Sequence, residues 1–278
     1  MSALDKATVA QLRAFMAQAK PGEERALLNT VLRLTAKWRS QLLSNTMVAQ
    51  SGRTIQNGPF AGMCYLPNAA EGALAARLLG SYESEIHPHL MAFVADGLDE
   101  VVDIGSAEGY YAVGLARLMP KATIYAHDTD PRARSLCTEL ASLNNVADRI
   151  RVEAEFAGAD FERFVGRRCL FIVDIEGAER ELLDPDRWPA LRFLSLIVET
   201  HPGAAPGITE ALVERFRPTH DFEVVRQSAK TTPVPEWLQE LGHLDSLLAV
   251  WEWRSHPTPW LVLRPSRAKM HNIEPPTD

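Results

Sequence analysis

The sequence predicts an α/β protein in which a mostly parallel sheet is preceded by a helical region and closed by an antiparallel hairpin. Three observations support this fold class. Beyond residue 99, short apolar runs alternate with amphipathic segments, which is typical of parallel strands joined by crossover helices. Before that point, apolar residues recur at helical spacing. Near the C-terminus, FEVVRQ and WLVLRP are two further apolar runs that can pair as an antiparallel hairpin.

The individual elements follow from the same patterns. The expected helices are Leu4–Ala19, Pro21–Leu43, Glu71–Leu79, His87–Asp96, Tyr110–Met119, Pro131–Leu143, Ala178–Leu183, Thr209–Phe216 and Pro235–Val250. The expected parallel strands are EVVDIG, TIYAHD, IRVEAEF, LFIVDIEG and LSLIVETH. The stretch GPFAGMCYLPN predicts an ordered loop or a short hairpin. We expect a helical cap or dimerisation subdomain over 1–96, a sheet domain over 97–265 and a frayed tail over 266–278.

The composition excludes several classes of function. With 278 residues, 46% of them hydrophobic, the chain can bury one substantial core. The formal net charge of −7 argues against a nucleic-acid partner, because such binding depends on neutralising phosphates. Three widely spaced cysteines without a CxxC pair predict neither a disulfide framework nor a zinc cluster. No apolar stretch approaches the about 18 residues of a membrane span. We therefore expect a cytoplasmic protein with no membrane contact, a small-molecule partner and a homodimeric assembly.

The stretch VVDIGSAEG is the most informative motif. An apolar run ends in Asp103, two glycines follow at Gly105 and Gly109, and a helix is expected to begin next. In open α/β sheets, ligands bind beyond the carboxyl ends of the strands, where glycines let the backbone approach them closely. The GxGxxG pattern of NAD and FAD sites would need glycines at Ala107 and Tyr110. A dinucleotide site is therefore disfavoured.

This motif resembles motif I of class I S-adenosylmethionine-dependent methyltransferases, whose sheet is Rossmann-like. The resemblance implies S-adenosylmethionine as cofactor, although Ala107 replaces the middle glycine common in that superfamily. Asp128 ends the next expected strand, where such folds place a carboxylate for the ribose hydroxyls. The alternative is that Asp128, Thr129 and Asp130 only cap the helix beginning at Pro131. The resulting cofactor-binding candidates are Asp103, Gly105, Ser106, Gly109, Asp128 and, near the adenine, Glu155.

Two later motifs narrow the resemblance to FkbM-like methyltransferases. LFIVDIEGAERELLDP carries a D-x-E-G-x-E element after the fourth strand, and LSLIVETHPG carries a V-E-x-H element after the fifth. The likeness covers roughly residues 55 to 202 and is silent about the substrate. Upstream, Tyr82 in GSYESEIHP is a further cofactor-binding candidate, with packing next to a helix start as its alternative.

The same two motifs bring four ionisable side chains together. Residues i and i+2 of an extended chain point the same way, so Asp174 pairs with Glu176, and Glu199 with His201, at the ends of neighbouring strands. Carboxylates at this density need a cation, a proton or an arginine. Three interpretations remain open. Asp174, Glu199 and His201 can hold a divalent metal (Mg, Mn or Ca), or Asp174, Glu176 and His201 can act catalytically without metal, or the acids can stabilise a helix start.

The segment WEWRSHPTPW has two interpretations. Its aromatic residues and Arg254 can line an acceptor pocket, or the segment can belong to the packed hairpin that closes the sheet, which we favour. Taken together, the motifs predict S-adenosylmethionine-dependent O-methylation of a small-molecule hydroxyl, such as that of a sugar or specialised metabolite, assisted by a metal or a base. The alternatives are methylation of a protein or peptide, and a non-catalytic partner protein that only binds the cofactor.

Overall fold

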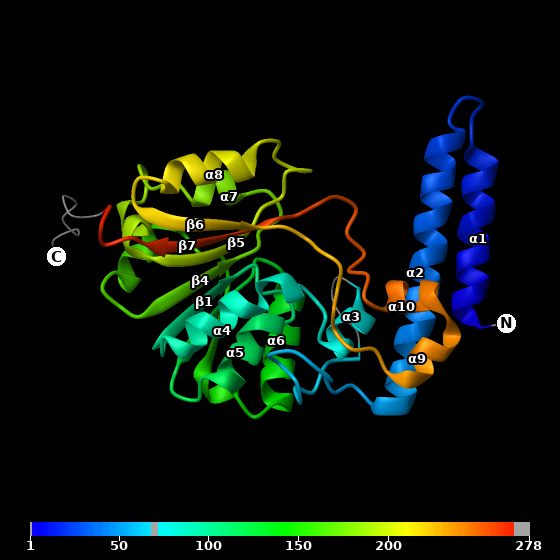
Figure 1. The fold of residues 1–278 in the computed structure, drawn as a ribbon, viewed down its shortest axis with the longest axis horizontal. Coiled ribbons are helices and arrows are strands. Elements are labelled where there is room, and N and C mark those ends of the chain that lie inside the picture. Colours follow the sequence, from blue (N-terminus) through cyan, green and yellow to red (C-terminus); the bar gives the residue numbers. More distant parts are fainter. Residues whose placement is uncertain (1, 68–71, 270–278) are drawn as a thin grey trace.

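The computed structural model describes residues 2–67 and 72–269 (Figure 1). Its centre is a seven-stranded sheet with the order β3-β2-β1-β4-β5-β7-β6. The first five strands are parallel, whereas β7 runs antiparallel to both β5 and β6. The predicted Rossmann-like fold class, with its C-terminal antiparallel hairpin, is therefore confirmed. The strands are β1 (Glu100–Ile104), β2 (Thr123–His127), β3 (Ile150–Glu153), β4 (Cys169–Val173), β5 (Ser195–Glu199), β6 (His220–Val225) and β7 (Trp260–Pro265).

Helices cover both faces of this sheet. Figure 1 shows α4, α5 and α6 on one face, and α7 and α8 on the other. Their bounds are α4 (His87–Ala95), α5 (Tyr110–Leu118), α6 (Pro131–Leu143), α7 (Glu179–Leu182) and α8 (Ile208–Phe216). Short 3-10 helices lie at Ser84–Ile86, Ala147–Arg149, Gly158–Phe164 and Pro189–Phe193.

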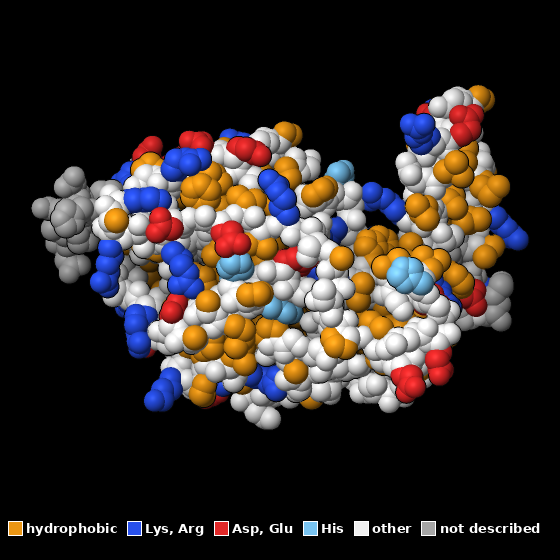
Figure 2. Space-filling model, viewed as in Figure 1, with side chains coloured by type: hydrophobic (Ala, Val, Ile, Leu, Met, Phe, Trp, Pro, Cys, Tyr) orange, Lys and Arg blue, Asp and Glu red, His pale blue; other side chains and the backbone are white. Residues whose placement is uncertain are grey.

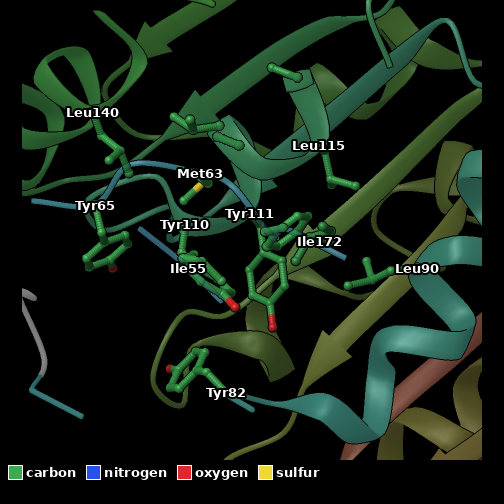
Figure 3. Packing of buried hydrophobic residues seen from close by; sticks show 14 of the residues in the cluster. Ile55, Met63, Tyr65, Tyr82, Leu90, Tyr110, Tyr111, Leu115, Leu140 and Ile172 are labelled. Carbon is green, nitrogen blue, oxygen red and sulfur yellow. The ribbon is translucent and has the colours of Figure 1, made fainter. Parts of the chain in front are cut away.

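The central strands are apolar on both sides because both sides are covered. All residues of β1 and β4 are buried. Val101 points into the hydrophobic cluster under α5 and α6, and its neighbour Val102 points into the cluster under α8. Figure 3 shows the first cluster, in which Leu115 of α5 and Leu140 of α6 contribute to the same core as Ile172 of β4.

The first two helices, α1 (Ala3–Gln18) and α2 (Glu24–Ser51), form an arm that projects from the sheet domain (Figure 1). The predicted second helix ended at Leu43, but α2 continues to Ser51 because its apolar face, with Met47, is buried in the main core. No residue of α1 is buried. Figure 2 shows hydrophobic side chains along the arm, and the exposed large ones there are Val9, Met16, Leu28 and Leu32. The homodimer stays a prediction.

The connection between β6 and β7 returns to this arm. It contains α9 (Glu236–Leu241) and α10 (His243–Ala249), and Asp245 of α10 accepts two hydrogen bonds of 2.7 Å from Arg39 of α2. The single helix predicted over 235–250 is wrong, because Gly242 adopts φ 119° and ψ 165° between α9 and α10. Residues 251–259 follow this connection and contact α2, where Trp253 donates a hydrogen bond to Ser40 and Arg33 donates one to the Ser255 carbonyl.

The remaining predictions concern the N-terminal region, the domain division, the tail and membrane-spanning helices. The short hairpin expected around GPFAGMCYLPN is confirmed by an antiparallel bridge between Thr54 and Cys64. The helix expected from Glu71 appears as α3 (Leu74–Leu79), and Glu71 itself lies outside the described residues, as do residues 270–278 of the predicted tail. The division at residue 97 stays a prediction, since the main core contains residues from both sides of it. Among the described residues, no helix combines the length and apolar character needed to cross a bilayer.

Candidate functional site

A cavity of about 710 Å³ opens at the carboxyl ends of β1, β2 and β4. Open α/β sheets bind their ligands at this position, and the volume suits a medium-sized organic molecule. Among the sequence-predicted site residues, the lining includes Gly105, Asp128, Glu155, Asp174 and Glu176. The other predicted residues lie outside this lining: Tyr82, Asp103, Ser106, Gly109, Glu199 and His201.

The loop between β1 and α5 needs glycine at two positions. Gly105 has φ +82°, and a Cβ at this residue would overlap the carbonyl oxygen of Asp174. Gly109 has φ +89°, and its added Cβ would lie 2.7 Å from Sγ of Cys137 on α6. Between them, Ala107 also adopts a left-handed conformation, with φ 45°. The loop is thus held tightly against its neighbours while its backbone borders the cavity.

Asp128 connects this loop to the end of β2. Its Oδ2 accepts a hydrogen bond of 2.9 Å from the Ala107 amide, and its Oδ1 accepts one of 2.8 Å from the Asp130 amide. Asp130, not Asp128, is the N-cap of α6, because its side chain accepts from the Arg132 amide. The capping alternative is therefore confirmed for Asp130 and wrong for Asp128. Each carboxylate oxygen has two lone pairs, so Asp128 can accept further hydrogen bonds from a ligand in the cavity.

Asp103 and Ser106 hold the loop from behind. Asp103 is 2% exposed, and its Oδ2 accepts a hydrogen bond of 3.1 Å from the Ala112 amide of α5. Burial raises the pKa of Asp103 to about 7, although this hydrogen bond favours the charged form. Ser106 is also buried, and its amide donates to the His127 carbonyl at 3.0 Å. Contact between these two side chains and a cofactor stays a prediction.

The other end of the cavity is aromatic. Phe156 and Trp188 line it together with the exposed Glu155. Gly158 lets the indole of Trp188 approach, because a Cβ on Gly158 would overlap that ring. Glu153, two residues earlier in the chain, does not line the cavity, and its Oε2 lies 3.8 Å from Nε2 of His127. A flat apolar ligand group with a polar edge fits this end, with Glu155 near the edge.

A second cavity, of about 480 Å³, adjoins the first, and Glu176 lines both. His201 lines the second cavity from the turn after β5, and Tyr82 lines it from the segment after α3. The guanidinium of Arg77 on α3 lies 4.1 Å from the centroid of the Tyr82 ring. Tyr82 therefore lies on this side and not in the first cavity. Our favoured interpretation of WEWRSHPTPW is confirmed only for Trp260, which begins β7. Residues 251–259 precede the hairpin, and Trp253 and Arg254 among them line the second cavity.

His201 lies where the two cavities meet, surrounded by carboxylates. Its Nδ1 is 2.6 Å from Oε1 of Glu179, while its Nε2 is 3.4 Å from Oδ1 of Asp174 and 3.5 Å from Oε2 of Glu176. Burial lowers the pKa of the imidazole, but the hydrogen bond to Glu179 and the charges of Glu199, Glu179 and Glu176 outweigh burial and leave the pKa raised. The ring is thus a proton acceptor held between acids.

The turn after β4 presents two of these acids in different ways. Glu176 adopts a left-handed conformation, with φ 53°, and its side chain is 75% exposed. Glu179 begins α7 and its side chain is completely buried. Strained residues of this kind cluster at functional sites. The left-handed backbone at Glu176 lies in the turn between β4 and α7, and Glu179 at the start of α7 contacts His201 from the buried side.

Arg254 gathers the remaining acids into a buried network. Its guanidinium donates to Glu83, Glu199 and Glu252, and Tyr111 donates to the other oxygen of Glu83. Burial, with Glu199 nearby, raises the pKa of Glu83 to about 8, although Arg254 opposes this shift. Glu199 therefore faces an arginine through one oxygen and lies 3.8 Å from Nε2 of His201 through the other.

A group of side chains suited to a metal ion differs from the predicted set by one residue. Asp174, Glu176 and His201 each offer one ligand atom, and these atoms lie within 4.8 Å of one another. Oxygen and imidazole ligands suit divalent cations such as Mn²⁺. The predicted set contained Glu199 in place of Glu176, and metal binding by Glu199 stays a prediction.

Sequence reasoning missed several residues of the site. Glu179 was assigned only to a helix start, although it is the last acid of the D-x-E-G-x-E element. Arg77 belongs to no motif that we recognised. Glu83 lies in GSYESEIHP next to Tyr82, but it was not selected, because only the folded chain brings it to the network around Arg254. Arg254 was considered as an acceptor contact, but its three carboxylate partners were not predicted.

No protein-family model matches the chain. Among curated proteins, the chain is similar to the release factor glutamine methyltransferase of Synechocystis sp. (strain ATCC 27184 / PCC 6803 / Kazusa), with 31% identity over 81 residues. This match covers 29% of this chain and 27% of that protein, so the chain matches about a quarter of the length of this relative.

The chain is also similar to solved structures. For the O-methyltransferase TomG from Streptomyces achromogenes in complex with SAM, the identity is 13%, the coverage 72% of this chain and 83% of that one, and the TM-score 0.43. For cofactor-bound Rv0187 from MTB, the identity is 16%, the coverage 88% of this chain and 98% of that one, and the TM-score 0.44. For the O-methyltransferase from Bacillus cereus in complex with SAH, the identity is 9%, the coverage 83% of this chain and 91% of that one, and the TM-score 0.42. At these identities the likeness concerns the fold alone.

Proposed function

We propose that the protein is an S-adenosylmethionine-dependent methyltransferase that methylates a hydroxyl group of a small molecule. The observation that carries this proposal is the pair of adjoining cavities. The first has the glycine loop and Asp128 at the carboxyl end of the sheet, and the second has His201 at its junction with the first. One cavity suits a nucleoside cofactor, and the other suits the acceptor. A sugar or specialised metabolite that carries a hydroxyl group is the acceptor class that we propose.

The residues of the first cavity fit the cofactor. The backbone of the glycine loop would lie against its amino-acid part, Asp128 would accept hydrogen bonds from its ribose hydroxyls, and Glu155 and Trp188 would border its adenine. The bound cofactor supplies a methyl group made electrophilic by the adjacent sulfonium. The work left to the protein is alignment of the acceptor at about 3 Å from that methyl and removal of the acceptor's proton.

His201 is our candidate for the proton acceptor. Its Nε2 faces Asp174 and Glu176, on the side where the two cavities meet, while Nδ1 is occupied by Glu179. A neutral imidazole with a free Nε2 lone pair can take a proton from a hydroxyl, and the surrounding carboxylates stabilise the imidazolium that results. Glu176 and Asp174 then serve to orient the acceptor and to balance charge.

A metal-assisted version of the same reaction is the second candidate, favoured by the closeness of the Asp174, Glu176 and His201 ligand atoms. A bound divalent metal would lower the pKa of an acceptor hydroxyl. Chelator treatment followed by addition of Mg, Mn or Ca separates the two versions. Loss and recovery of activity supports the metal, whereas full activity in chelator leaves His201 as base.

The proposal is tested by following S-adenosylhomocysteine formation with a panel of sugar hydroxyl, amine, thiol and peptide acceptors. We expect turnover with a hydroxyl acceptor. Turnover with a peptide alone would favour the alternative of protein methylation, with which the similarity to the Synechocystis release factor glutamine methyltransferase also agrees. Calorimetry with S-adenosylmethionine and with NAD completes the test. Binding of the first without turnover on any acceptor would favour a non-catalytic partner protein, and binding of NAD alone would exclude a methyltransferase.

A further inference from the structure

We propose that Glu179 is a positioning residue that holds the imidazole of His201 with Nδ1–H toward the protein interior and Nε2 toward the acceptor. This inference rests on the proposed function and adds a residue to it. Glu179 itself lines neither cavity, but it contacts His201, which lines the second, so we infer that it acts through His201.

The contact geometry supports a fixed ring orientation. Oε1 of Glu179 lies 2.6 Å from Nδ1 of His201, a distance typical of a strong hydrogen bond to a charged group. The same oxygen accepts a hydrogen bond of 3.1 Å from the Gly177 amide. Because this oxygen already accepts from an amide, we infer that it also accepts from Nδ1, which must then carry the hydrogen. The tautomer of the neutral ring is then determined, and its lone pair lies on Nε2.

The burial of Glu179 indicates that this contact is its main role. Its side chain is 0% exposed, whereas that of His201 is 7% exposed. Burying a carboxylate costs several kcal/mol unless a partner compensates it. The partners of this carboxylate among the described residues are the imidazole and the Gly177 amide, and no arginine or lysine forms an ion pair with it there. A helix-start role alone would not need a buried side chain.

The opposite side of the ring shows what the orientation achieves. Nε2 faces Asp174 and Glu176, the two residues that also line the first cavity. Glu199 lies farther from Nε2 and is held by Arg254. Rotation of the imidazole would turn its lone pair away from the junction of the cavities. The orientation is useful whether Nε2 takes a proton or binds a metal, since both need the lone pair.

Spectroscopy of the wild-type protein gives the first test, which needs no acceptor. Nitrogen-15 NMR of histidine-labelled protein, at a pH where the His201 ring is neutral, distinguishes the two tautomers, and a His201→Gln variant assigns the signals. We expect the Nδ1–H tautomer. Observation of the Nε2–H tautomer would overturn the proposal, even if the protein proved to be an active methyltransferase.

Kinetics of three substitutions give the second test. Glu179→Leu removes the acceptor, Glu179→Asp withdraws it by one methylene, and Glu179→Gln keeps an acceptor oxygen within reach. We expect kcat to fall about 10- to 100-fold in the first two variants, with KM and cofactor Kd unchanged, and to recover in part in the third. Glu210→Gln, an exposed acid on the neighbouring α8, is the matched control and should retain wild-type kcat.

The outcomes separate this proposal from the proposed function. If Glu179→Leu fails to fold, as judged by circular dichroism, the kcat of Glu179→Asp and the tautomer of the wild-type His201 ring still test the positioning role of Glu179. Wild-type kcat in a folded Leu or Asp variant would overturn the positioning role while the methyltransferase stands. The Nδ1–H tautomer in a protein without turnover on any acceptor would support the Glu179 contact and refute the methyltransferase.

Discussion

The two cavities are built in different ways. The first is formed mainly by backbone turns and side chains that follow β1, β2, β3 and β4, so most of its residues lie close to strand ends in the sequence, although Trp188 comes from farther along the chain. The second is formed by α2, α3, the turn after β5 and residues 251–259, which lie far apart in the sequence. Its floor is a network of buried charges around Arg254. The first depends on chain conformation, and the second depends on compensated charge.

Because of this difference, we expect the two cavities to tolerate different kinds of substitution. A turn with glycine at positive φ accepts almost no other residue but needs few distant partners. A buried ionic network tolerates a conservative change at one site only if the charge balance survives. We therefore expect substitutions in the first cavity to act mainly on cofactor affinity, and substitutions in the second to act on turnover or on stability. The following predictions test this separation.

The largest effect is expected from His201→Gln. Removing a positioned general base lowers kcat by about 100- to 10,000-fold. Cofactor Kd should stay at its wild-type value, because His201 lies outside the lining of the first cavity. Steady-state kinetics and calorimetry measure the two quantities. A kcat near that of the wild type would place the proton acceptor elsewhere, and a weakened Kd would contradict the separation of the cavities.

Arg254→Met should destabilise the protein by about 3–5 kcal/mol, because the substitution removes the shared cation of the buried Glu83 and Glu199, while Glu252 keeps its ion pair with Lys230. Urea unfolding measures the loss. The matched control is Arg168→Met, which breaks an exposed ion pair with Asp99 and should cost less than about 1 kcal/mol. Equal losses in the two variants would show that the network is not held by charge compensation.

Asp128→Ala should weaken cofactor binding by about tenfold or more, since a hydrogen bond to a charged group contributes about 1.5–3 kcal/mol. Asp130→Ala is the control, because Asp130 caps α6 and lies outside the lining. It should lower stability without changing Kd. If both variants bind the cofactor like the wild type, Asp128 does not contact the ribose and only connects the two loops.

The sequence predicted the first cavity better than the second, and the reason is distance along the chain. Strand ends, glycines and the Asp128 position are local signals, and the helix predicted over Pro131–Leu143 agrees with α6. The partners of Arg254 are separated from it by 55 residues at Glu199 and by 171 at Glu83. No local pattern encodes such pairings. The break at Gly242 was also missed, because apolar spacing continued across it.

The smallest effect is expected from Glu83→Gln, and it concerns pH. The folded protein holds the Glu83 proton up to about pH 8, whereas the ordinary pKa of a glutamate is 4.5. Because the folded state binds this proton more tightly, its contribution to stability is complete below the ordinary pKa and declines as pH rises toward 8. The free energy of unfolding should therefore fall with pH over this interval, and the fall should be shallower in the variant.

Urea unfolding of wild type and Glu83→Gln at several pH values between about 5 and 9 measures this difference. The glutamine is isosteric and keeps an oxygen that can accept from Arg254, so the network can persist with one ionisable group fewer. Parallel pH profiles would mean that Glu83 is already ionised at neutral pH. In that case Arg254 and Lys230 would together compensate the three carboxylates of the network, and the second cavity would be more negative than the raised pKa of Glu83 implies.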